Sequence, residues 1–214
     1  IHVGYSNLSP YLVKALVATE DERFYDHSGI DFIALARAVV KRGLLGQVSA
    51  GGGSTITQQL AKQLYSNTAE STSERLLQKP IEWVIAIKLE RYYTKEEIIT
   101  MYLNYFDFLH NAVGIKNAAN VYFGKDPNKL SLDEAATLVG LCKNPSFFNP
   151  VRYPDRCRER RNVVLGQMLK AGYITDSEFR ECSGKELTLT FHRFDHKDGI
   201  ATYFREFLRQ YMMA

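Results

Sequence analysis

Four positions in this sequence carry the pattern S/T-x-x-E, the signature of a capping box at the start of a helix. They begin at Ser71, Thr94, Ser131 and Thr175, and each precedes a segment whose apolar residues recur with helical spacing. Only residues 187–191 alternate with the period of a strand, and the chain has no βαβ rhythm, internal repeat or low-complexity tract. The sequence therefore predicts a mainly α fold and excludes a Rossmann fold or a protein kinase.

The apolar spacing predicts further helices around these boxes. The expected helices cover residues 10–19, 32–42, 55–65, 75–92, 95–104, 112–122, 132–142, 155–171 and 202–213. The first is mostly apolar, with Ser9 as its N-cap and Pro10 at its first position, so we expect it to be buried. Residues 43–53 are too rich in glycine for either regular structure and predict a mobile loop that acts as a lid.

Composition limits the classes of function. The chain has 214 residues, 45% of them hydrophobic and 24% charged, which predicts one large globular domain or two small ones. A net charge of +3 is too small to predict nucleic-acid binding. Cys142, Cys157 and Cys182 are far apart and predict neither a zinc site nor a disulfide framework. No apolar run is long enough to span a membrane, and since the sequence begins at Ile1 without methionine, we expect an excised domain whose anchor was cut away.

Residues 20–29, Glu-Asp-Glu-Arg-Phe-Tyr-Asp-His-Ser-Gly, follow the predicted buried helix. If that helix continued, Glu20, Phe24 and His27 would share one face, and Asp21 would lie about 100° round the axis. A carboxylate beside an aromatic ring and an imidazole can serve as a tuned base. The alternative interpretation is a solvated helix end with a histidine that makes only structural hydrogen bonds.

A second motif makes the first one specific. Residues 52–59, Gly-Gly-Ser-Thr-Ile-Thr-Gln-Gln, arrive about 25 residues after the pattern Glu-Asp-x-x-Phe-x-x-His-x-Gly. Together the two motifs resemble those of the peptidoglycan glycosyltransferases, glycosyltransferase family 51, found in class A penicillin-binding proteins and in monofunctional wall polymerases. Further similar segments occur in the same order at residues 78–82, 102–104, 114–125, 130–136, 143–146 and 160–162.

Two segments depart from the family pattern. Gln78 stands where the family has arginine, which removes one cation from the phosphate-binding side. Residues 108–113, Phe-Leu-His-Asn-Ala-Val, replace the family's Phe-Gly-x-Gly-Ala-Tyr, so this loop lacks both glycines and its backbone path is an open question.

The resemblance implies the polymerisation of lipid II. In this reaction the 4-hydroxyl of an acceptor N-acetylglucosamine attacks the anomeric carbon of a lipid-linked muramic acid unit with inversion, and a lipid pyrophosphate leaves. By match to the motifs, the catalytic residues are Glu20, as the general base, and Glu82, which could hold cations, bind a metal or assist the leaving group. A positioned carboxylate base typically contributes about 10²- to 10⁴-fold to the rate.

The motifs also imply a set of substrate-binding residues. They are Asp21, Phe24, His27, Ser54, Thr55, Gln59, Lys62, Gln78 and Lys79. Lys62 and Lys79, together with a divalent cation (Mg or Mn) whose ligands are unknown, would neutralise the pyrophosphate, and no organic cofactor is implied. Ser54, Thr55 and Gln59 lie at the start of a predicted helix, where free backbone N–H groups favour anions.

Several of these residues have structural alternatives. Phe24 is as readily a packing residue as a substrate contact, and His27 is expected to orient its neighbours rather than to transfer protons. We expect Asp21 to support Glu20. The arginine-rich residues 152–161 are expected to form a solvated face, and contact with phosphate or anionic lipid is the alternative.

Members of this family combine a lysozyme-like helical head lobe with a smaller membrane-associated jaw lobe, here about residues 40–79. The glycosyltransferase domain is expected to cover residues 1–185. Because no S-x-x-K or K-T-G motif follows, residues 186–214 are expected to be an extension or linker towards an absent transpeptidase domain. The implied partners are lipid II, the lipid-linked glycan strand, the membrane surface and that transpeptidase domain. The implied location is the outer, periplasmic or extracellular, face of the bacterial cell membrane.

Two other functions remain open at this point. Paired carboxylates also serve glycoside cleavage, so one alternative is a lysozyme-like wall-cleaving enzyme. The other is a non-catalytic module that binds lipid II, which Gln78 and the altered loop at residues 108–113 would suit.

Overall fold

A computed structural model describes residues 2–43, 53–65, 72–192 and 211–212, and within these residues the fold is mainly α, as predicted. The helices are α1 (Pro10–Glu20), α2 (Phe32–Gly43), α3 (Ile56–Tyr65), α4 (Thr72–Tyr92), α5 (Lys95–Tyr105), α6 (Ile115–Phe123), α7 (Leu132–Leu141), α8 (Pro154–Lys170) and α9 (Asp176–Gly184), with 3-10 helices η1 (Tyr5–Asn7), η2 (Phe24–Asp26) and η3 (Pro127–Lys129). In this part of the chain the only β pairing is an isolated bridge between Asp107 and Val113.

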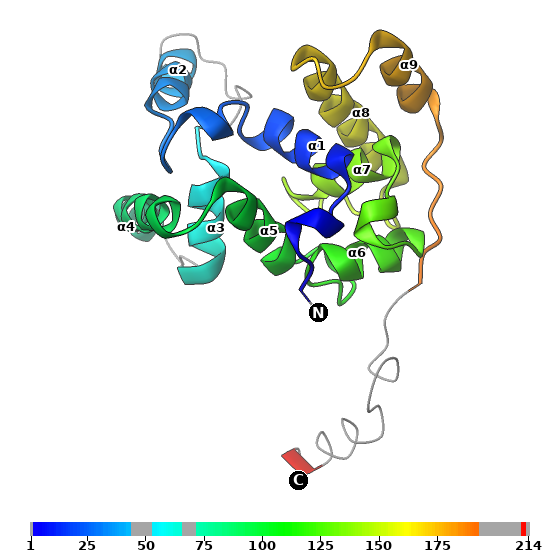
Figure 1. Ribbon diagram of the computed structural model, residues 1–214, viewed down its shortest axis with the longest axis horizontal. Coiled ribbons are helices and arrows are strands. Elements are labelled where there is room, and N and C mark those ends of the chain that lie inside the picture. The colour runs from blue at the N-terminus through cyan, green and yellow to red at the C-terminus, as the bar shows by residue number, and fades with distance from the viewer. Residues whose placement is uncertain (1, 44–52, 66–71, 193–210, 213–214) are drawn as a thin grey trace.

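Helix α1 crosses the middle of the molecule and packs against α7 and α8 (Figure 1). Its apolar side chains are buried, as predicted, and so is nearly every residue of α7. Pro10 opens α1 as predicted, but Ser9 does not cap it with its side chain. Its hydroxyl donates to the carbonyl of Leu130 at 3.1 Å and so ties the start of α1 to the segment before α7.

The capping boxes form where the structure describes them. The side chains of Thr94 and Thr175 each accept from the amide three residues later, and each box glutamate accepts in return. Glu134 likewise accepts from the amide of Ser131 at 3.0 Å. The fourth box begins at Ser71, outside the described residues. These predictions succeeded because a capping box involves only residues within one turn.

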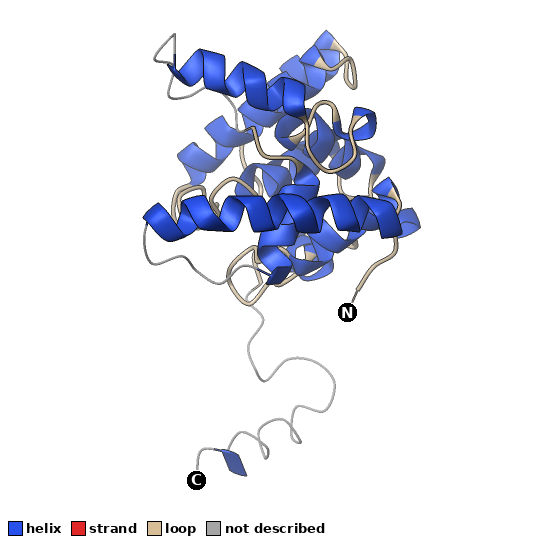
Figure 2. Cartoon of the chain, turned by 90° about the vertical axis from the view of Figure 1, so that its left-hand side faces the viewer, coloured by secondary structure: helices blue, strands red, loops and turns tan. Residues whose placement is uncertain are grey.

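Helices α2, α3 and α4 lie together on one side of the molecule (Figure 1). Helix α3 packs against both α4 and α5 and so joins this side to the rest of the fold. Helix α4 runs across the front of Figure 2, with α2 above it. The predicted jaw lobe, residues 40–79, contains α3 and the start of α4. Residues 44–52 and 66–71 of that range, and with them most of the predicted lid, lie outside the described residues.

The predicted strand at residues 187–191 is wrong. The segment is not helical, but no strand among the described residues pairs with it. Instead, the amides of Thr190 and His192 donate to the carbonyls of Tyr122 and Val121, at the end of α6, at 2.9 and 2.8 Å. The predicted helix at residues 202–213 lies almost entirely outside the described residues.

The loop at residues 108–113 takes a left-handed path although it contains no glycine. Leu109, His110 and Asn111 have φ angles of 67°, 53° and 64°. A left-handed conformation costs a non-glycine residue about 1–2 kcal/mol. The hydroxyl of Tyr122 donates to the carbonyl of Phe108 at 2.7 Å, and this buried bond helps to hold the strained loop in place.

Candidate active site

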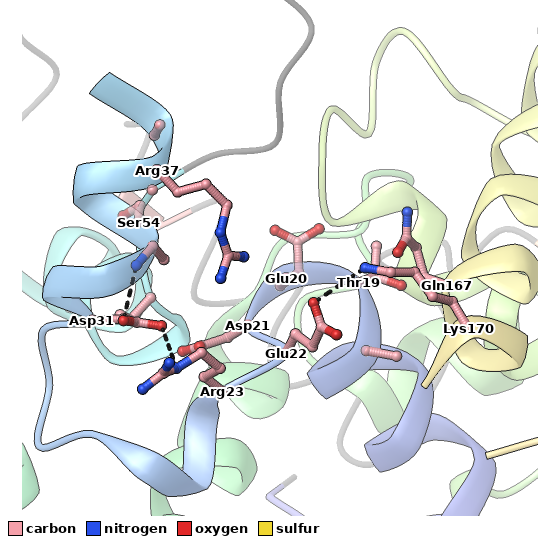
Figure 3. A pocket seen from close by; sticks show the side chains of 15 residues that line it. Thr19, Glu20, Asp21, Glu22, Arg23, Asp31, Arg37, Ser54, Gln167 and Lys170 are labelled. Carbon is pink, nitrogen blue, oxygen red and sulfur yellow. Dashed lines mark hydrogen bonds and ion pairs between the residues drawn. The ribbon is translucent and has the colours of Figure 1, made fainter. Parts of the chain in front are cut away.

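Helix α1 ends at Glu20, whose carboxylate faces a cavity of about 280 Å³ bordered by α1, α2, α8 and residues 53–55 (Figure 3). The side chain of Glu20 is 14% exposed. The Gln59 amide donates to Glu20 Oε2 at 3.0 Å, and the Tyr102 hydroxyl donates to the Gln59 carbonyl oxygen at 3.1 Å. Because an ionised carboxylate only accepts hydrogen bonds, the NH₂ group of Gln59 must face Glu20, and its carbonyl oxygen then faces the Tyr102 hydroxyl.

Arg160 supplies a positive charge beside this carboxylate. Its Nη2 lies 3.6 Å from Glu20 Oε1, and its side chain is 10% exposed. The guanidinium lies 5.8 Å from the ring centre of Phe148, and Gly140 leaves room for it, since a Cβ there would lie 3.1 Å from Arg160 Cγ. Burial lowers the pKa of Arg160, whereas the nearby Glu20 raises it. The carboxylate at the end of α1 is thus held by an amide on one oxygen and faces a cation on the other.

Asp21 points away from this carboxylate because α1 does not continue past Glu20. The prediction that Glu20, Phe24 and His27 share one helical face is therefore wrong. Both oxygens of Asp21 lie 3.1 Å from His27 Nε2, and Oδ2 also accepts from the Ile56 amide at 3.0 Å. Asp21 thereby ties the end of α1 to the first residue of α3.

His27 uses both of its ring nitrogens. Nδ1 lies 3.2 Å from the Gly29 amide and accepts its hydrogen bond, so the proton must sit on Nε2, which donates to Asp21. Gly29 has φ 94°, and a Cβ on it would lie 2.9 Å from the backbone of Ala86 in α4. The last two motif positions, His27 and Gly29, therefore anchor the turn after α1 to α4.

The amides of Thr55, Ile56 and Gln58, at the start of α3, donate to protein acceptors. Thr55 Oγ1 donates to the Gly29 carbonyl at 2.7 Å and accepts from the Gln58 amide at 3.1 Å. The Gln58 side-chain oxygen accepts from the Thr55 amide at 3.3 Å and from the Ser54 hydroxyl at 3.2 Å. The Ile56 amide donates to Asp21 and is therefore not free, whereas the binding of a substrate anion by Ser54, Thr55 and Gln59 stays a prediction. Ser54 and Thr55 still line the cavity.

Phe24 is completely buried and lines no part of the cavity. The ammonium of Lys95 lies 4.3 Å from its ring centre and donates to the His27 carbonyl at 2.7 Å and to Glu90 at 2.8 Å. In this structure Phe24 is therefore a packing residue, and its ring contacts Lys95 and not the cavity.

The second predicted catalytic residue lies elsewhere. Glu82, on α4, is 3% exposed and accepts from the Lys79 ammonium at 2.8 Å, while the Lys79 side chain is 48% exposed. Neither residue lines the cavity that holds Glu20. Lys62 is exposed on α3, and Gln78 is partly buried on α4. The structure thus places the two glutamates in separate surroundings.

Sequence reasoning missed several polar and charged residues of the cavity. Arg37, on α2, points towards Glu20 across the opening, and Gln167 and Lys170 enter from α8 (Figure 3). No motif marked them. Arg160 and Arg161 were expected to form a solvated face, but Arg161 is buried and the side chain of Arg160 is only 10% exposed. Helical spacing could have shown that Arg161 lies on the buried face of α8. Cys157 lies four residues before it, and Val164 and Met168 lie three and seven residues after it.

Comparison with known proteins identifies the class. The family model described as transglycosylase matches residues 1–169. Penicillin-binding protein 1A of Aquifex aeolicus is 41% identical over 99% of this chain and 28% of its own length. Penicillin-binding protein 1A of Escherichia coli is 41% identical over 99% of this chain and 24% of its own length. Penicillin-binding protein 1F of Bacillus subtilis is 41% identical over 87% of this chain and 26% of its own length. The chain spans about a quarter of the length of these relatives.

The crystal structure of penicillin-binding protein 1A from Haemophilus influenzae matches with a TM-score of 0.46 and 30% identity, over 74% of this chain and 19% of that one. The family model covers most of the chain, so this chain belongs to the transglycosylase family. The predicted family of peptidoglycan glycosyltransferases, and with it the predicted class of enzyme, is confirmed.

Proposed function

We propose that this domain polymerises lipid II into glycan strands, with Glu20 as the general base. The observation that carries the proposal is the position of Glu20, at the end of a buried helix with its carboxylate facing a cavity. A hydroxyl is a poor nucleophile and needs a positioned base to accept its proton. The bonds from Tyr102 through Gln59 hold Glu20 Oε2, which leaves the rest of the carboxylate group to receive the acceptor 4-hydroxyl.

The leaving pyrophosphate needs positive charge, and we propose that Arg37 and Lys170 contribute to it. Both line the cavity from walls on either side of Glu20. Lys170 lies 3.4 Å from Glu22, but that pair is largely exposed to water, so it can be exchanged for a phosphate at small cost. Lys79 and Lys62 lie outside this cavity and remain candidates for the lipid-linked phosphates of the second substrate molecule.

The donor atoms of the described residues do not form a metal site by themselves. Within that part of the chain no three His, Cys, Asp or Glu side chains converge on one point. Magnesium and manganese sites of this kind commonly use one or two carboxylates together with substrate phosphates. A divalent cation held between one carboxylate and the substrate phosphates therefore stays part of the proposal, with its ligands unassigned.

We propose that α2 and α4 face the membrane surface at which the lipid-linked substrate lies. The exposed apolar residues of this side are Phe32, Ile33, Val39, Val40, Ile81, Val84 and Ile87. Phe32, Ile33 and Ile87 line one shallow cavity of about 360 Å³, so the patch continues from one helix to the other. Such a surface suits the interface of a bilayer. Among the described helices none has the length and hydropathy needed to cross a membrane.

The relatives support two further parts of the proposal. They are named penicillin-binding proteins and are about four times as long as the match, so we propose that a penicillin-reactive transpeptidase domain accompanies this domain. In that arrangement the enzyme acts at the outer face of the bacterial cell membrane, and residues 186–214 form the connection between the two domains.

The decisive experiment incubates the purified protein with lipid II in detergent micelles and resolves the products on a gel. Long glycan chains would support the proposal. If the protein instead solubilised purified sacculi and left lipid II unpolymerised, it would be a wall-cleaving enzyme. Binding of lipid II without any product would identify a non-catalytic module. The Glu20→Gln variant serves as the matched control for each assay.

A further inference from the structure

A second cavity, of about 480 Å³, lies along the flank of α1. Val13 and Val17 of α1 are buried at its floor, together with Leu8. Three tyrosines, Tyr5, Tyr25 and Tyr173, also line it, and they come from three separate segments of the chain. None of the motifs singled out in the sequence accounts for a cavity lined by three tyrosines.

This cavity is separate from the active-site cavity, with which it shares no lining residue, but α1 contributes to the lining of both. The ion pair between Glu22 and Lys170 borders the cavity that holds Glu20 (Figure 3). Three residues further along the same two segments, Tyr25 and Tyr173 line the second cavity. The exposed ion pair therefore forms a ridge between the two cavities. From Val13 to Glu20 the helix rises about 10 Å, a distance that a short run of sugar units can span.

The chemistry of the lining favours an uncharged or anionic ligand with hydroxyl groups. Partial burial, and then the neighbouring Tyr5, Tyr173 and Glu96, raise the pKa of Tyr25 to about 12, so its phenol keeps its proton and can donate a hydrogen bond. The ammonium of Lys14 lies 5.9 Å from the ring centre of Tyr173 and is exposed at the rim. None of the side chains that line this cavity is a carboxylate.

Aromatic rings with polar hydroxyls, over an apolar floor, suit a ligand that is apolar on its faces and polar at its edges. A sugar ring has this character, and the carboxylate of a peptide attached to the sugar would find Lys14. Tyr25 is 54% exposed, so its ring is available for such a contact.

We propose that this tyrosine-lined cavity binds remote sugar units of the glycan strand whose end is being joined at Glu20. The identity of the ligand rests on the proposed function, because it is the polymerised product that extends beyond the reacting sugars. Binding there would retain the strand between successive additions without contributing to the bond-forming step.

The test uses soluble oligomers of N-acetylglucosamine, so that binding is measured without any reaction. The dimer, tetramer and hexamer are titrated into the wild-type chain and into Tyr25→Ala, Tyr173→Ala and Lys14→Gln, with isothermal calorimetry and NMR of the tyrosine rings. Tyr92→Ala is the matched control, because Tyr92 is 75% exposed at the end of α4 and lines neither cavity. Tyr25→Phe keeps the ring without the hydroxyl, and circular dichroism verifies the fold of every variant.

We expect the hexamer to bind more tightly than the dimer and to shift the ring signals of the three cavity tyrosines. Each removed ring should weaken hexamer binding about threefold to tenfold, while Tyr92→Ala leaves it unchanged. In the lipid II assay the same variants should make shorter strands and still couple the first two units at the wild-type rate.

The proposal is overturned if the hexamer fails to bind, or if it binds equally well to the tyrosine variants. It is also overturned if a proline-rich peptide, which aromatic grooves can bind as well, shifts these tyrosines and the hexamer does not. These outcomes differ from a failure of the proposed function, which would appear as a wild-type chain that forms no polymer from lipid II.

Discussion

The Arg160 guanidinium lies 3.6 Å from the Glu20 carboxylate, although 140 positions separate the two residues in the sequence. Helix α8 carries the arginine and packs against α1, which ends at the glutamate. The Arg160 Nε is buried without a hydrogen-bond partner, so the side chain is not held there by a complete set of hydrogen bonds of its own. This pair, the Gln59 contact and the cavity form the centre of the site.

Replacing Glu20 with Gln should lower the rate of lipid II polymerisation by about 10²- to 10⁴-fold, since an amide cannot accept the proton of the acceptor hydroxyl. Binding of lipid II should change little, because the side chain keeps its shape. Fluorescent lipid II consumption and equilibrium binding measure the two effects separately. Glu22→Gln, at an exposed neighbouring carboxylate, is the control. A Glu20→Gln variant with nearly the wild-type rate would remove Glu20 from the role of base.

Replacing Arg160 with Met should reduce kcat about 100-fold, because the carboxylate loses the cation that orients its free oxygen. Arg160→Lys should restore part of this loss, since it returns the charge without the planar guanidinium. Arg158→Gln is the matched control on the same helix, where the arginine forms only an exposed pair with Glu186. If Arg160→Met changed the KM or the melting temperature and left kcat unaltered, the residue would be structural.

Replacing Asp21 with Asn should destabilise the fold by about 1–3 kcal/mol, since one oxygen would become an NH₂ group facing either the His27 Nε2–H or the Ile56 amide. Urea unfolding measures the change. Asp26→Asn, at an exposed carboxylate in η2, should have almost no effect. Equal stability of the two variants would contradict the structural role assigned to Asp21.

The Leu109→Gly variant should have a free energy of unfolding about 1 kcal/mol higher than that of Leu109→Ala. The reason is that the φ of Leu109 is 67°, and a residue with a Cβ is strained at this angle. The comparison of Leu109→Gly with Leu109→Ala cancels the packing that both variants lose. The same pair of substitutions at the exposed Lys88, in the last third of α4, should show the opposite order by about 1 kcal/mol. Chemical unfolding of the four variants gives the difference in free energy of unfolding between glycine and alanine at each position. If the alanine variant were the more stable one at both positions, the result would argue against a left-handed loop.

The three cysteines should make the fold less stable at alkaline pH. Burial raises the pKa of Cys157 from 9.0 to about 12, and burial also raises the pKa of Cys142, with Glu20 adding to the effect. The folded state therefore binds these protons more tightly than the unfolded state, so stability is complete below pH 9 and falls as the pH rises towards 12. Unfolding free energies measured at pH 7.5, 9 and 10 should decline, with a smaller slope in Cys142→Ala. The thiols should react with iodoacetamide only after unfolding.

Part of the candidate site could be predicted from the sequence because its motifs are local. The segment from Glu20 to Gly29 contains only ten residues, and the order of acidic, aromatic and small residues within it marks a specific turn. The sequence could not place Asp21 against Ile56, or Arg160 against Glu20, because these contacts join segments that only tertiary packing brings together. The same limit explains why Arg37 and Lys170 were missed.

The error at the end of α1 has a physical cause. Helical periodicity predicted that Glu20, Phe24 and His27 share one face, but the helix stops at Glu20. Asp21 gains more from the Ile56 amide and His27 than it would on a further turn, and the chain turns to reach them. Contacts distant in sequence thus overruled a local preference.

By itself, the sequence determined the mainly α class, the helix starts at the capping boxes and the family, because all three depend on residues close together along the chain. The tertiary structure alone decided which glutamate faces the cavity, which residues only support it and which cations surround it. Charge and burial depend on what surrounds a side chain in three dimensions, and for Glu20 those surroundings come from α1, α3, α5 and α8.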